Sequence, residues 1–229
     1  MTIPSEISAS DAISDIPPVW FDVPSTFFAL PLAETPEERA ERAETFVRQL
    51  YSQGDESIWE PAAPYYEALA EHFSDSGLSY SAMGLFSTDE GAVVQCAFTL
   101  AAVETGHADP DIAAQGTLAT LSVDSDNDAR WLDLPCGPAI SCVTLTELVL
   151  NAGITASGEQ EKLLTGQIQV HVPFPNAPYT AVFTMHTASM DYWGEICDMT
   201  AAVLDTVSFE EPEVSSRGVA QDGTDTVTT

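Results

Sequence analysis

The chain has few basic residues. Its 229 residues include 36 aspartates and glutamates but only 6 lysines and arginines, which gives a formal net charge of -30 at pH 7. A charge of this sign repels nucleic-acid phosphates and anionic membrane surfaces. The composition therefore argues against nucleic-acid binding. It leaves two interpretations open: a surface that keeps the protein soluble, or a surface that binds a basic partner.

Long hydrophobic runs are also missing. No stretch reaches the 18 consecutive apolar residues expected of a membrane-spanning helix. Residues 1–18 contain no Lys or Arg and no apolar run of 7 or more residues, so they do not resemble a secretory signal. We therefore expect no membrane insertion and a cytoplasmic location.

The motifs of common catalytic and cofactor sites are absent as well. The sequence has no G-x-S-x-G, no P-loop and no G-x-G-x-x-G. Its four histidines lack the spacing of zinc ligands, and its four cysteines form no C-x-x-C pair. The sequence therefore predicts free thiols in a reducing compartment, with no cofactor, no metal site and no catalytic residue.

What the chain does contain is 45% hydrophobic residues, enough for one generous core. Residues 1–17 and 211–229 show no hydrophobic period, and we predict that both are disordered tails, the first of them acidic. A single domain over 18–210 is the simplest organisation.

The first half of this domain is predicted to begin with an arm and a helix. Residues 19–32 are aromatic and contain prolines, which favours an edge strand or an extended arm. Thr35 and Glu38 form a capping box around Pro36, and this predicts a helix over about 36–52.

A second acidic helix is expected to follow. A capping box at Ser57 and Glu60 predicts its start, and Pro61 and Pro64 predict that only its later turns are regular. Residues 34–75 hold eleven acids, so the exposed faces of this helical pair form a negative surface.

Strand patterns dominate the rest of the chain. A hairpin is predicted over 78–87 and 92–103, with a turn centred on Asp89 and Glu90. Asp109 and Pro110 predict the start of a third helix, which continues in spite of Gly116. Further strands are expected over 129–135 and 138–149.

A second hairpin over 167–187 has a predicted register. Pairing Val172 with Ala181 brings apolar residues together along one face and sets His171 opposite Val182. His186 then lies about 13 Å further along the sheet, too far to share a metal with His171. A closing helix over 189–209 carries an apolar stripe. The elements together predict an α+β fold, a mostly antiparallel sheet with helices packed on it.

The segment DLPCGPAISC contains the candidate nucleophile. A reactive cysteine needs a nearby cation or a helix N-terminus, and Cys136 has only Arg130 close in sequence. We therefore interpret Cys136 as part of a Gly-Pro bend and Cys142 as a strand residue. The alternative is a cysteine-dependent hydrolase or thiol enzyme that uses Cys136 with His171 or His186.

Several segments carry a family resemblance. FALPL before PEERAERAE, then LPCGPAI, VHVPFP with AVFTMHTAS, and YWGEICDMTAAVLDTVSF are similar to the uncharacterised Mog1/PsbP-like proteins common in actinobacteria. The resemblance covers roughly residues 20–210. It implies an antiparallel sheet backed by helices that serves binding and scaffolding rather than catalysis, and it brings no catalytic residues with it.

The functional expectation is therefore a non-enzymatic binding or accessory protein. Its partner is expected to be another protein, with a basic one favoured by charge, bound at the acidic helical face or at a sheet edge. The candidate binding residues on the helical face are Glu37, Glu38, Glu41 and Glu44. A chaperone-like factor for a secretion system and an immunity protein that neutralises a basic toxin domain both fit.

Overall fold

The computed structural model describes residues 16–211, except 89, 90, 92, 154 and 156. The predicted tails therefore lie almost entirely outside the described residues, and so does the turn centred on Asp89 and Glu90.

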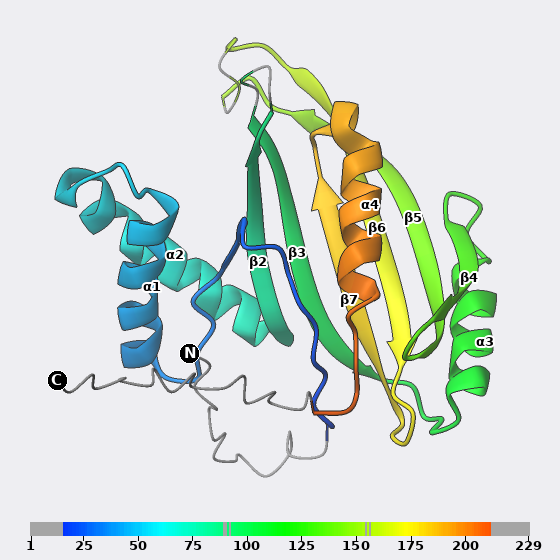
Figure 1. Cartoon of the computed structure of the whole chain (residues 1–229). Helices are drawn as coiled ribbons and strands as arrows, with labels where there is room; N and C mark the ends of the chain where they lie inside the picture. Colours follow the sequence, from blue (N-terminus) through cyan, green and yellow to red (C-terminus); the bar gives the residue numbers. More distant parts are fainter. Residues whose placement is uncertain (1–15, 89–90, 92, 154, 156, 212–229) are drawn as a thin grey trace, which may run out of the picture.

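The described residues form an antiparallel sheet of seven strands with helices on both faces (Figure 1). This confirms the predicted α+β class, with 32% of the described residues helical and 37% in strands. The strand order is β1-β2-β3-β7-β6-β5-β4. The strands are β1 (Phe27–Ala29), β2 (Leu78–Ser87), β3 (Val93–Glu104), β4 (Asp128–Leu134), β5 (Gly137–Leu150), β6 (Glu161–Pro173) and β7 (Tyr179–Thr187).

The main core lies between one face of the sheet and the last helix. After a short 3-10 turn, η1 (Met190–Tyr192), the helix α4 (Trp193–Leu204) crosses β6 and β7 and buries Ile196 and Val203 (Figure 1). The arm before β1 runs along the same face, where Phe21 packs edge-on against Phe98 and Phe183. The predicted arm and the apolar stripe of the closing helix are thereby confirmed, although α4 is shorter than the expected 189–209.

In the described part of the chain, the opposite face carries helices only near the two sides of the sheet. The helices α1 (Pro36–Leu50) and α2 (Glu56–Asp75) pack together beside β1 and β2, where Phe46 and Tyr66 contact Phe28 and Met83. The helix α3 (Pro110–Leu121) lies over β4, β5 and β6. The middle of this face, along β3 and β7, is left partly exposed between them.

Two helix starts agree with the sequence and one differs. The side chains of Thr35 and Asp109 accept hydrogen bonds from the first backbone N–H groups of α1 and α3, as predicted. The expected cap at Ser57 was wrong: Asp55 is the N-cap, and its carboxylate accepts from the backbone N–H of Ser57 at 3.0 Å. A carboxylate at this position also interacts favourably with the helix dipole.

The prolines of α2 do not delay its regular part. The helix runs continuously through Pro61 and Pro64, contrary to the prediction. Both prolines are exposed and lie in the first half of the helix. Water can therefore bind the carbonyl groups that lose their intrahelical partners, which reduces the cost of each proline.

The register of the second hairpin is confirmed, but its length was underestimated. Val172 pairs with Ala181, and His171 pairs with Val182. However, β6 begins at Glu161, six residues before the predicted start, and pairs with β5 as far as Leu150. The hairpin of β5 and β6 therefore extends beyond the rest of the sheet (Figure 1).

Candidate functional site

The four predicted binding residues all lie exposed on α1. Glu37, Glu41 and Glu44 follow one another at helical spacing and share one stripe of the helix. Glu38 lies beside this stripe and forms an ion pair with Arg42 at 2.5 Å. The prediction that these side chains form one acidic surface therefore agrees with their positions, although they do not have equal surroundings.

A groove between α1 and α2 gives this surface its shape. Its volume is about 300 Å³, and Ala40, Val47, Ala63 and Pro64 form its apolar lining. Around them stand four carboxylates and one guanidinium, from Glu44, Glu56, Glu60, Glu67 and Arg48. Glu44 is thus the one predicted binding residue that lines the groove, and the other three glutamates of the groove come from α2.

An aromatic side chain, that of Trp59, also lines the groove. Trp59 is held in place because its indole N–H donates to the carbonyl of Tyr51 at 3.0 Å. The guanidinium of Arg48 lies over the ring, 4.8 Å from its centre. This arrangement shows that the ring already accommodates a cation on one face.

The two helices hold each other firmly, so the groove is a preformed feature. The rings of Phe46 and Tyr66 pack with centroids 4.7 Å apart. Arg39 is buried and donates to the carbonyls of Ala33 and Glu34 and to the carboxylate of Glu71. A groove with fixed walls loses little conformational entropy when a partner binds.

The thiol-enzyme alternative requires His171 or His186 to lie near Cys136, and the structure places neither of them there. Cys136 packs against the main core, on the side of the sheet that α4 covers. His171 and His186 are on the other side, because each alternates with buried core residues of its strand. The sheet therefore separates the thiol from both imidazoles, and the described residues contain no Cys136–histidine pair.

Burial also makes the thiols less acidic. It raises the pKa of Cys136, Cys142 and Cys197 above the ordinary value, and it raises the pKa of Cys96 to about 11. All four cysteines are unpaired, as the sequence predicted.

We expect iodoacetamide to label Cys136 slowly. A raised pKa lowers the fraction of thiolate at pH 7, and the thiolate is the reacting species. Its labelling rate, measured by mass spectrometry in the variant C96S/C142S/C197S, should fall below that of a free peptide thiol and rise steeply above pH 9. Rapid labelling below pH 7 would contradict this account and revive the thiol-enzyme alternative.

One edge of the sheet is open over half a strand. β4 pairs only with residues 137–143 of β5, so residues 144–150 have a strand neighbour on one side among the described residues. This part of the hairpin exposes four apolar side chains by 42 to 57%, those of Leu145, Leu148, Val149 and Leu164. Glu147 lies in the middle of residues 144–150, and its negative charge is already paired, since its carboxylate accepts a hydrogen bond from the ammonium group of Lys162 at 2.6 Å.

Two comparisons with known proteins identify no relative of this chain. Within the described residues, none of the helices combines the length and apolar character needed to cross a bilayer. Neither a scan of protein-family models nor a search of curated proteins finds a match for the chain.

Proposed function

We propose that the protein is a non-enzymatic binding protein that engages a basic protein partner at the groove between α1 and α2. The observation that carries the proposal is the groove itself, where four carboxylates and one guanidinium surround an apolar floor. A lysine or arginine side chain can lay its aliphatic part on that floor while its charge meets Glu44, Glu60 or Glu67.

The charge of the helical pair supports a basic partner. Residues 34–75 contain eleven acids and three arginines, a local balance of -8. Such a surface attracts a basic partner over a distance and raises the rate of association, an effect that salt screens. The resemblance to Mog1/PsbP-like proteins agrees with this proposal. A chaperone for a secretion system and an immunity protein are two roles that fit it. The unpaired cysteines favour a cytoplasmic setting.

The open edge of β5 is a second candidate surface for the partner. Within the described part of the chain, residues 144–150 have no strand partner on the side away from β6, and they carry exposed apolar side chains. This combination binds an added strand. Replacing Leu145 and Val149 with lysine should abolish binding if the partner adds a strand here. Unchanged binding in L145K/V149K assigns recognition to the groove alone.

The partner can be identified by purifying the natively tagged protein and analysing its companions by mass spectrometry. Our proposal predicts a protein with an excess of Lys and Arg that is released as NaCl is raised. Capture of acidic partners only, at every salt concentration, would contradict it.

A further inference from the structure

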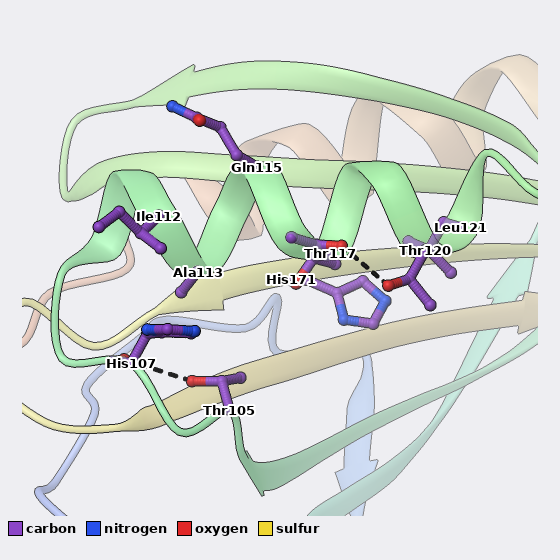
Figure 2. Close-up of a pocket in the computed structure, with 10 residues that line it drawn as sticks. Thr105, His107, Ile112, Ala113, Gln115, Thr117, Thr120, Leu121 and His171 are labelled. Atoms are coloured by element: carbon purple, nitrogen blue, oxygen red, sulfur yellow. Dashed lines mark hydrogen bonds between the residues drawn. The ribbon is translucent and has the colours of Figure 1, made fainter.

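A hollow lies between α3 and the sheet, away from the acidic groove. Its volume is about 650 Å³, and Figure 2 shows α3 along one side with His171 of β6 below it. His107, from the loop after β3, closes the end near the start of α3.

The shape of this hollow follows from the small side chains of α3. The helix buries only Ala113 and Ala114, so small side chains make its contact with the sheet and space remains beside them. Gly116 lies at the wall of the hollow, and a Cβ at this position would meet no other atom within 4 Å. Glycine inside a helix costs about 1 kcal/mol relative to alanine. No packing in the described residues requires this glycine.

None of the ten lining residues is an Asp, Glu, Lys or Arg, in a protein whose net charge is -30. Six of its ten residues have polar side chains and four are apolar or glycine, among them Ile112 and Leu121. Burial lowers the pKa of His171, so its imidazole is neutral at pH 7. An ion entering the hollow would therefore lose water without meeting an opposite charge.

One polar atom in the floor has no partner. The Nε2 atom of His171 is buried and makes no hydrogen bond among the described residues. By contrast, the hydroxyl of Thr120 donates to the carbonyl of Gly116 at 2.9 Å. A buried nitrogen without a hydrogen bond is unfavourable, so a group in the hollow that reaches it after a small turn of the ring restores a lost interaction.

We propose that the hollow between α3 and the sheet is a binding site for a small uncharged molecule that has both an apolar part and a hydroxyl group. The apolar part contacts Ile112, Leu121 and the bare backbone of Gly116. The hydroxyl group forms a hydrogen bond with His171, while the surrounding threonines bind any further hydroxyl groups. This site is separate from the acidic groove, and it can exist whether or not the protein binds a basic partner.

The test is a titration followed by NMR of the ¹⁵N-labelled full chain. The probe is benzyl alcohol, and benzoate and benzylamine serve as charged analogues of similar size. We expect benzyl alcohol to shift the amide signals of α3 and the ring nitrogens of His171 in a saturable way. The charged analogues should bind at least about 10-fold more weakly, because the site gives them no counter-charge.

Three variants locate the binding. G116L fills the hollow and should abolish saturable shifts. G116A should retain them and raise the melting temperature, since a methyl group fits and alanine favours the helix. H171F keeps the ring but removes its nitrogens; it should weaken binding about 5-fold or more without lowering the melting temperature.

The result that overturns the proposal is equally specific. Shifts that do not saturate, that lie outside α3 and β6, or that are as strong with benzoate as with benzyl alcohol would refute it. Unchanged binding in H171F would also refute it, even if G116L fails to fold.

Discussion

Replacing Gly166 with valine should lower the free energy of unfolding by about 3 kcal/mol, the upper part of the range for overpacked cores. A Cβ at this position would lie 2.3 Å from Cζ3 of Trp193 and 2.9 Å from its Cε3. The clash involves the body of an aromatic ring, which cannot yield as the end of a flexible chain can. The start of α4 would have to move away from β6.

Urea denaturation of G166V and of the wild-type protein measures this effect. In a domain of this size, a loss of about 3 kcal/mol corresponds to a melting temperature lower by roughly 6 to 12 °C. G194A is the matched control, because Gly194 lies in α4 next to Trp193 and a Cβ at Gly194 would meet no atom within 4 Å. A loss of stability in G194A as large as that in G166V would contradict the described contact between α4 and β6.

Reversing three charges of the groove should slow partner binding strongly. In E44K/E60K/E67K the electrostatic potential of the groove changes from negative to positive. The basic side chain of the partner is proposed to bind at this place. The association rate constant should fall about 10- to 100-fold at low salt, as expected when electrostatic steering is lost. None of the three glutamates forms an ion pair among the described residues, so the fold should be unaffected.

The matched control changes the same net charge elsewhere. Glu104, Asp198 and Glu210 are exposed, distributed over other elements, and likewise outside the four ion pairs of the described chain. E104K/D198K/E210K should reduce the association rate constant by less than about 3-fold. Equal slowing in the two triple variants would mean that total charge, and not the groove, attracts the partner.

The sequence predicted a structural feature correctly where a single local pattern was unambiguous. The register of β6 and β7 followed from Val172 and Ala181, because a shift by one residue would turn the apolar side chains to the wrong face. The start of α2 was wrong because two nearby polar residues, Asp55 and Ser57, could each cap the helix, and only the folded chain selects between them.

The start of β6 was missed for a different reason. Residues 161–166 include Gly166 and two charged residues, which weaken a strand pattern. Their pairing with β5 and the close approach of Trp193 to Gly166 depend on distant parts of the chain. Tertiary contacts of this kind leave no local signal.

The candidate sites show the same division. An acidic helical surface could be predicted because exposure and charge follow from helical spacing in α1. The groove could not, since it needs Glu44 of α1 to face Glu60 and Glu67 of α2. Likewise, the sequence shows Gly116 only as a residue of low helix propensity within a predicted helix. That Gly116 and His171 line the same hollow depends on how α3 packs on the sheet.

The most direct test of the acidic groove is the salt dependence of binding to the partner that native purification identifies. We predict that the dissociation constant of the wild-type protein rises at least about 10-fold between 50 and 500 mM NaCl, while that of E44K/E60K/E67K is high at low salt and changes little. Equal dissociation constants for the two proteins, with no dependence on salt, would contradict the assignment of this surface.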